Sequence, residues 1–198
     1  MRAVAFQSVL KSLDLDESGC LSRTQYFALL DSLDERIAQL EEWLKGKAAV
    51  DKKAKLLQTQ RGVGYLTALA TVHTLGDVSR FTRTAKQVTS FSGLDPLEHS
   101  SAGRTRFGSV SKAGSPMLRF QLGQAASIAA RFDPKLKSFY KRLAKKKPKR
   151  VAKTAAARKL LVKLAIMLRD EITAEEFDKR GRTVGNARAV SGSAMTAP

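Results

Sequence analysis

The sequence predicts an all-α protein in which an N-terminal coiled-coil helix precedes a helical domain. Two patterns indicate this: apolar residues repeat at heptad spacing near the N-terminus, and helix start and stop signals recur along the rest of the chain. No segment shows convincing period-two alternation, so no strand is predicted. We expect four parts: residues 1–21, an N-terminal helix and polar turn; 22–50, the coiled-coil helix; 51–172, the main helical domain; and 173–198, a basic, disordered tail.

Heptad spacing defines the coiled-coil helix. Ser22 and Gln25 form an S-x-x-Q capping box, which predicts that the helix starts there. The residues between the apolar positions are mostly charged or polar, as in a two-stranded coiled coil. The partner helix would belong either to the same chain or to another subunit, and we expect a homo-oligomer. The apolar positions, spaced 4-3-4-3-4, are Tyr26, Leu30, Leu33, Ile37, Leu40 and Leu44.

An acidic stretch just before this helix is close to a calcium-binding EF-hand loop. Asp14, Asp16 and Ser18 fall at loop positions one, three and five, and Gly19 falls at position six. Gln25 stands at position twelve, where such a loop needs a bidentate carboxylate. We therefore favour a polar turn followed by a helix cap over a calcium site, and we predict no metal ligands in this chain.

Capping residues divide the main domain into helices. Asp, Ser and Thr side chains can accept bonds from the first backbone N–H groups of a helix, and proline suits the first helical position. Glycine favours the end of a helix. The predicted starts are Asp51, Thr82 or Thr84, Ser115-Pro116 and Asp133-Pro134; the predicted ends are Gly76 and Gly93; and the last long helix is expected over about Val151–Asp170.

Two glycines separate the first two helices of this domain. Gly62 and Gly64 stand in an R-G-V-G turn, the arrangement of a helix-hairpin-helix element, in which backbone N–H groups at a helix start bind a DNA phosphate. An ordinary helix–helix turn remains an equal alternative. His73, in the following helix, is expected to be a packed or surface residue because no Cys/His cluster accompanies it.

Charge is distributed unevenly. The formal net charge is +18, but residues 1–51 carry six basic and nine acidic side chains, so the excess of cations lies further along the chain. A polyanionic partner is the first expectation. From Lys141 to Lys163 there are eleven basic residues and no acid. This run is either a solvated face or a strip that contacts a nucleic-acid backbone, with candidate residues Lys145, Lys146, Lys147, Lys149 and Arg150.

A Gly/Ser-rich basic stretch, Gly93–Arg119, lies between two predicted helices. A loop of this length is uncommon unless it is functional or disordered. Its cations could hold phosphates, and its serines place hydroxyl groups beside them. A solvated basic loop is the alternative. The candidate nucleic-acid ligands here are Arg104, Arg106, Lys112 and Arg119.

Cysteine usage and hydropathy bear on the compartment. The single cysteine, Cys20, excludes an internal disulfide and fits a reducing compartment. No apolar run approaches the ~20 residues of a membrane span, and the N-terminus has no apolar secretory core. We expect a cytoplasmic protein.

Several motifs in order resemble a family of recombinases. GVGYLTALAT, LGDVSRF and AKQVTSFSGLDP are followed by HSSAGRTRFGSVSKAGSPMLR. This series is similar to the C-terminal domain of bacterial insertion-sequence transposases of the 110/116/902 type, which are related to the Piv DNA invertase. The similarity extends over about residues 30–170. Two positions depart from the family pattern: Arg61 replaces a proline, and Ala102 replaces a common glycine.

The resemblance implies DNA transposition through a serine nucleophile. In this family an N-terminal nuclease domain supplies four acidic residues (DEDD) that bind divalent metal, and a structured RNA guides the reaction. The nucleophile maps to Ser101, with Ser100 as the less favoured neighbour. A serine hydroxyl needs a base, a metal or nearby cations to attack a phosphate. His99 is a weak candidate for that base.

The resemblance also leads to an expectation about completeness. No β-rich segment with spaced acids precedes the coiled coil, so we expect the DEDD nuclease domain to be missing, Mg²⁺ to be needed only with that domain, and the chain to be inactive alone. The alternative is a non-catalytic basic helical module that binds DNA or RNA and dimerises. No membrane partner is expected.

Overall fold

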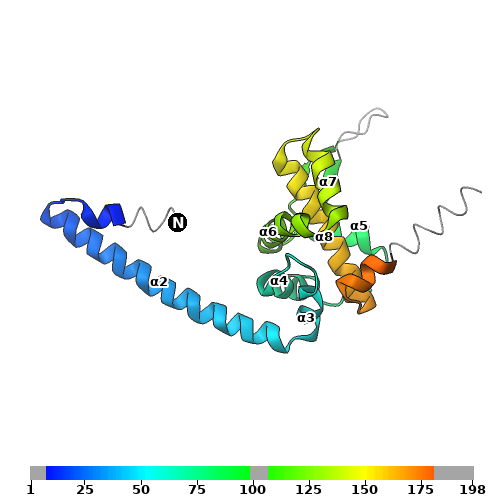
Figure 1. The fold of residues 1–198 in the computed structure, drawn as a ribbon, viewed down its shortest axis with the longest axis horizontal. Coiled ribbons are helices and arrows are strands. Elements are labelled where there is room, and N and C mark those ends of the chain that lie inside the picture. Colours follow the sequence, from blue (N-terminus) through cyan, green and yellow to red (C-terminus); the bar gives the residue numbers. More distant parts are fainter. Residues whose placement is uncertain (1–7, 99–106, 181–198) are drawn as a thin grey trace, which may run out of the picture. The chain divides into compact units, whose positions relative to one another are not determined.

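The computed structural model describes residues 8–98 and 107–180, and its fold is mainly α, as predicted. The chain divides into two compact units, residues 1–46 and 47–198 (Figure 1). Within the described ranges, no helix combines the length and the apolar character that crossing a membrane requires.

The first unit contains a short helical segment at residues 8–12 and most of helix α2, Glu17–Val50. Asp16 starts α2: its carboxylate accepts a bond from the Gly19 N–H at 2.9 Å, and its carbonyl accepts one from the Cys20 N–H at 2.8 Å. The helix therefore begins five residues before the predicted start at Ser22, because Asp16 caps it upstream.

The helical conformation of residues 17–25 also excludes an EF-hand loop over Asp14–Gln25. An EF-hand wraps its oxygen ligands around the ion in an extended loop, which a continuous helix cannot do. No group of three potential metal ligands occurs anywhere in the described residues. The favoured interpretation placed the cap at Ser22; the structure instead has a short non-helical link at residues 13–16 and a helix that starts at Glu17 after Asp16.

The apolar positions of α2 remain open to solvent. Only Ala48 is buried along this 34-residue helix, whereas Leu33 and Ile37 are about half exposed. Leu44 is only partly exposed, and the other heptad positions are exposed. The helix itself is confirmed; its pairing into a coiled coil stays a prediction.

The second unit is built around the last long helix. Helix α8, Lys149–Asp170, packs against four other helices, and its Leu160, Leu161, Leu164 and Met167 side chains are fully buried (Figure 1). The elements around it are α3 (Lys52–Gln58), α4 (Tyr65–Leu75), the 3-10 turn η1 (Val78–Arg80), α5 (Thr84–Phe91), α6 (Pro116–Phe132) and α7 (Pro134–Ala144).

Most of the predicted caps are present in this unit; at the start of α5 the predicted Thr82 or Thr84 cap is absent, because Arg83 occupies the cap position and makes no side-chain capping bond. Asp51 accepts bonds from the N–H groups of Lys53 and Ala54 at the start of α3. Ser115 caps α6, and Asp133 caps α7 through its Oδ1 atom. Gly76 ends α4 with a φ of 60°. Local sequence signals therefore located most of the helix boundaries in this domain correctly.

The Gly/Ser stretch contains a small sheet that the sequence analysis missed. Strand β1, Pro96–Glu98, pairs antiparallel with β2, Phe107–Val110. Bonds beyond the strands extend the pairing: the Ser111 N–H donates to the Asp95 carbonyl at 2.9 Å, and the Ser111 hydroxyl donates to the Asp95 carboxylate at 2.6 Å. Strands of three and four residues are too short to show an alternating pattern.

The chain stays ordered beyond α8. Residues 174–180 are helical, so the expectation of a disordered tail from residue 173 was wrong for this segment. Ile172 and Ala174 are buried, and the Ala174 N–H donates to the Thr59 hydroxyl at 3.0 Å. These contacts with a residue 115 positions away hold the segment in place. The rest of the predicted tail, residues 181–198, lies outside the described residues.

Candidate nucleic-acid interface

The sequence-predicted ligands within the described residues lie at the α3–α4 turn, in the turn between β2 and α6, at Arg119 in the first turn of α6, and around the connection between α7 and α8. Ser101, Arg104 and Arg106 lie outside the described residues, as do His99 and Ser100. The remaining candidates all belong to described parts of the chain.

The two glycines of the α3–α4 turn have different surroundings. Gly62 has a φ of 92°, and a Cβ there would lie 2.6 Å from the backbone nitrogen of Ala129 in α6. The absence of a side chain at Gly62 is thus required for packing. Gly64 is exposed, has nothing within 4 Å of a Cβ position, and directly precedes α4. Of the pair, Gly64 is the one placed to approach a phosphate.

The turn between β2 and α6 is tightly constrained. Lys112 adopts a left-handed conformation with a φ of 58°, and its N–H donates to the Gly93 carbonyl at 3.1 Å. A Cβ on Gly93 or Gly114 would collide with backbone atoms on the opposite side of the turn. The exposed Lys112 side chain therefore projects from a fixed backbone.

Arg119 serves this turn as well as the surface. Its Nη1 atom donates to the Gly114 carbonyl and, at 3.4 Å, to the Ser92 carbonyl. One nitrogen of the Arg119 guanidinium thus holds the end of α5 beside the start of α6, although the residue was predicted as a phosphate ligand. The side chain remains half-exposed and borders a cleft with Lys112 and Lys153.

The strongest concentration of charge lies along α7 and the start of α8. A cleft of about 460 Å³ on α7 is lined by Pro134, Lys137, Ser138, Lys141, Arg142 and Lys145. Lys137, Lys141 and Lys145 are four residues apart, so they follow one face of the helix. We call the eight cations of this region the basic strip: Lys137, Lys141, Arg142, Lys145, Lys146, Lys147, Lys149 and Arg150.

The basic strip is available to a ligand. All its side chains are exposed. The ion pairs found among the described residues use Lys45, Lys163, Arg169 and Arg180, none of which belongs to the strip. Sequence reasoning did not name Lys137, although its spacing of four from Lys141 was visible in the sequence.

Arg150 connects the strip to the sheet. It lines a cleft of about 410 Å³ together with Arg158 of α8 and Gly108 and Ser109 of β2. The surface cations thus extend from α7 across the start of α8 to the strand that follows the Ser101 region in sequence.

Shifted acids in this unit have structural causes. A side-chain hydrogen bond from Arg169 lowers the pKa of Asp170, which also pairs with Arg180 at 2.9 Å. A bond from the Thr173 backbone N–H lowers the pKa of Glu176. Both carboxylates thus stabilise the end of α8 and the segment 174–180. Neither belongs to a cluster that could hold Mg²⁺, since the part of the chain that the structure describes contains no such group.

The second unit is therefore a mainly helical domain with an unpaired cationic surface. Residues 54–141, from α3 to α7, match the family described as "Transposase IS116/IS110/IS902 family". The chain is therefore similar to this transposase family over these residues, which make up less than half of its length.

Three curated relatives show the same similarity. The transposase for insertion sequence element IS1111A of Coxiella burnetii is 39% identical over 98 residues, which are 50% of this chain and 27% of the relative. A probable family 20 transposase of Pseudomonas aeruginosa is 34% identical over 52% of this chain and 30% of its own length. The transposase for element IS1328 of Yersinia enterocolitica is 32% identical over 48% and 28%. The matches thus span less than a third of each relative.

Proposed function

We propose that residues 47–180 form a DNA-binding part of a transposase that acts in DNA transposition. The observation that carries this proposal is the basic strip: eight exposed cations on α7 and the start of α8 without ion-pair partners in the described chain. Transposases act on DNA, whose backbone presents a phosphate every few ångströms. The family match and the charge of this surface support the same partner.

Phosphate contacts make a specific prediction about salt. Each cation that neutralises a phosphate releases counterions, so the logarithm of the affinity falls linearly with the logarithm of salt concentration. The test is a titration of a labelled DNA duplex with the purified chain at several salt concentrations. We expect a steep decrease in affinity. Affinity that is independent of salt would contradict the strip as the contact surface.

We further propose that Ser101 is the nucleophile, on the strength of the motif resemblance. It lies in sequence between β1 and β2, and the cleft that borders β2 contains Arg150 and Arg158, cations of the kind that neutralise a phosphate during transfer. Recombination would require a metal-binding nuclease domain of the DEDD type in addition to the residues described, since these residues offer no metal cluster.

Ser101→Ala separates this proposal from a purely DNA-binding role. In a reaction reconstituted with a family nuclease domain and a structured guide RNA, the substitution should abolish strand transfer and leave duplex affinity nearly unchanged. Ser100→Ala is the matched control and should retain activity. Equal activity of Ser101→Ala and the unmodified chain would favour the alternative, a non-catalytic module that binds DNA or RNA.

A second proposed role is homo-oligomerisation through α2. The specific observation is the exposed row of Leu30, Leu33, Ile37 and Leu40, at coiled-coil spacing. Pairing with the same helix of a second copy would cover this row. The flanking acids and bases, such as Glu41 and Lys45, which pair at 3.7 Å along the helix, would remain at its edges.

A further inference from the structure

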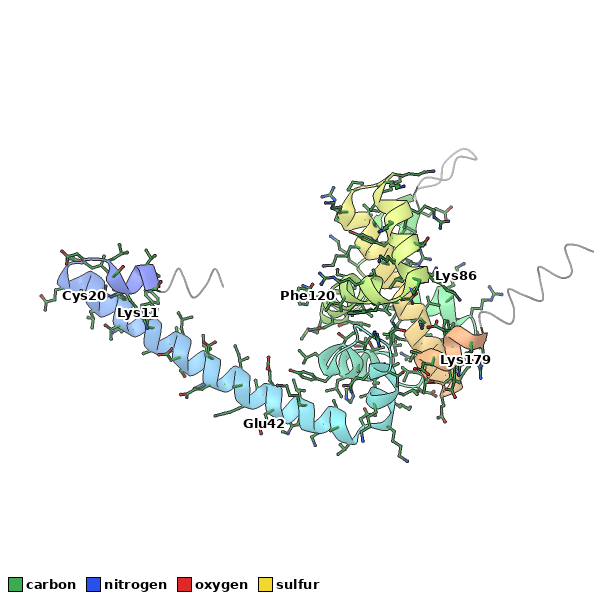
Figure 2. The ribbon with its side chains drawn as sticks, in the orientation of Figure 1. Lys11, Cys20, Glu42, Lys86, Phe120 and Lys179 are labelled. Carbon is green, nitrogen blue, oxygen red and sulfur yellow. The ribbon has the colours of Figure 1, made fainter. Side chains whose placement is uncertain are left out.

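An exposed aromatic ring lies beside three cations at the start of α6. Phe120 is 60% exposed and borders a cleft of about 340 Å³ that is also lined by Lys112, Arg119 and Lys153. Figure 2 labels Phe120 on the surface of this helix. None of the described residues that line the cleft is acidic. The volume lies within the range of small-molecule sites, roughly 300–1,000 Å³.

The inner wall of the cleft is apolar. Leu94 is buried and Val110 of β2 is half-buried, and both face the cleft from the side of the sheet. The ring–ring contact found among the described residues of this unit joins Phe81 and Phe91 and does not involve Phe120. A planar apolar ligand with an attached anion fits this combination of aromatic ring, apolar wall and cations.

A glycine keeps the cleft open. Gly123 lies in the interior of α6, where glycine lowers helix stability relative to alanine. Packing does not require it: a Cβ there would meet only the Cε of Lys153 at 3.5 Å, an ordinary contact. In contrast, a Cβ at Gly62 or Gly114 would collide with backbone atoms. The space beside Phe120 is thus retained at some cost in helix stability.

We infer that this cleft binds one unpaired nucleobase of a DNA strand, stacked on Phe120, with the adjoining phosphate held by Lys153 and Arg119. Base stacking on an exposed aromatic side chain is a general mode of single-strand binding. Gln124 borders the same cleft and lies 3.5 Å from Lys153 Nζ, so its amide is placed to bond a base edge. The inference rests on the proposed DNA binding and adds a preference for unpaired nucleotides.

The test compares two DNA duplexes with the full chain. One is fully paired; the other contains a single bulged 2-aminopurine, whose fluorescence changes when it stacks. Phe120→Ala should weaken binding of the bulged duplex roughly 5- to 100-fold, the range for loss of one stacked base, and should not change binding of the paired duplex. Phe132→Ala removes another exposed ring of α6 that does not line the cleft, and should change neither.

Gly123→Ala gives an independent measurement that a folding defect cannot imitate. The added methyl group should maintain or raise the melting temperature and still weaken binding of the bulged duplex, because it narrows the cleft. Unchanged affinity of both cleft variants for the bulged duplex would overturn the inference. The inference would also be overturned if the unmodified chain bound a duplex with an abasic bulge as tightly as the duplex with the 2-aminopurine bulge.

Two further outcomes identify what failed. If the paired duplex binds in a salt-dependent manner but the bulge adds no affinity that depends on Phe120, the inference is wrong and the proposed DNA binding stands. If neither duplex binds at low salt, both are wrong. Adenosine monophosphate serves as a competitor. If it displaces the bulged duplex when the nucleotide and the duplex are at equal concentrations, the cleft is a site for free nucleotides and the inference for a DNA strand is wrong.

Discussion

The ammonium group of Lys163 lies 2.8 Å from the carboxylate of Asp178, although 15 residues separate them. Lys163 is buried in α8, and its Nζ also lies 3.7 Å from the carboxylate of Asp133, the cap of α7, and 5.2 Å from the ring centre of Phe177. One buried cation therefore connects α8, the start of α7 and the segment 174–180. This arrangement helps to explain why residues 174–180 are ordered.

Asp178→Asn should loosen that segment without unfolding the domain. Asp178 is partly exposed, so solvent screening limits the loss to about 1 kcal/mol. Hydrogen exchange should accelerate at residues 174–180 more than in α6. Asp178→Glu, which keeps the charge, is the control; equal exchange rates in Asp178→Asn and the unmodified chain would show that the pair does not hold the segment.

Gly62→Ala should destabilise the second unit by about 2–4 kcal/mol, because the methyl group collides with α6 and the φ of 92° is unfavourable for alanine. Gly64→Ala is the matched control in the same turn. It has open space and a φ of −84°, so the expected loss is below about 1 kcal/mol. Urea denaturation measures both. Similar losses of stability in the two variants would mean that contact with α6 is not the reason for a glycine at position 62.

Acid should detach the segment 174–180 before the core unfolds. The pKa values of Asp170 and Glu176 are lowered in the folded chain, by Arg169 and by the Thr173 N–H respectively. Their stabilising contributions are therefore complete above their ordinary values of 3.8 and 4.5 and are lost as the pH falls through the lowered values.

Hydrogen exchange as a function of pH provides the measurement. Protection of residues 174–180 should fall below about pH 4, while protection of the α8 interior should persist. The double variant Asp170→Asn, Glu176→Gln should have lower protection in this segment than the unmodified chain at neutral pH and should lose less of it with acid. A segment that stays protected in this variant would contradict the assignment.

The α7 part of the basic strip should account for part of the salt dependence of DNA binding. Substitution of Lys137, Lys141 and Lys145 by alanine should reduce the slope of log affinity against log salt by about 2–3, since each phosphate contact contributes ~0.9. The variant that replaces Lys52, Lys53 and Lys55 in α3 removes the same charge from another surface of this unit. It should reduce the slope by less than ~1. Equal reductions would indicate that net charge, not the strip, determines affinity.

Disruption of the α2 row should abolish self-association. Leu33→Asp with Ile37→Asp places two charges at the proposed helix contact, and sedimentation should then report a monomer where the unmodified chain forms an oligomer. Ser32→Asp with Ala38→Asp adds the same charge at positions next to the row and should leave the oligomer intact. A monomeric unmodified chain would contradict the proposed role of α2.

Local signals in the sequence were sufficient for most helix boundaries of the second unit. Asp51, Ser115 and Asp133 cap helices as predicted because a capping bond joins residues only two or three positions apart. At the start of α2 the same reasoning named Ser22, but Asp16 makes the capping bond; both carry suitable side chains, and only the folded chain shows which one is used.

The candidate site was predicted less completely. The cations at residues 145–150 were evident from charge alone, and the family resemblance was evident from the ordered motifs. The separate roles of Gly62 and Gly64 could not be predicted from the sequence, because they depend on which of the two glycines contacts α6. Phe120 gave no signal in the sequence; its importance arises from its exposure beside Lys153, 33 residues further along the chain.

By itself, the sequence determined the mainly helical fold, most of the caps, the excess of positive charge and the resemblance to transposases, because each depends on neighbouring residues or on ordered motifs. Tertiary structure alone decided the β1–β2 pairing, the ordering of residues 174–180 and the cleft beside Phe120. These features depend on contacts between residues far apart in the chain, such as Thr59 with Ala174 and Lys163 with Asp178, whose free energy appears only when α8 is packed in the core.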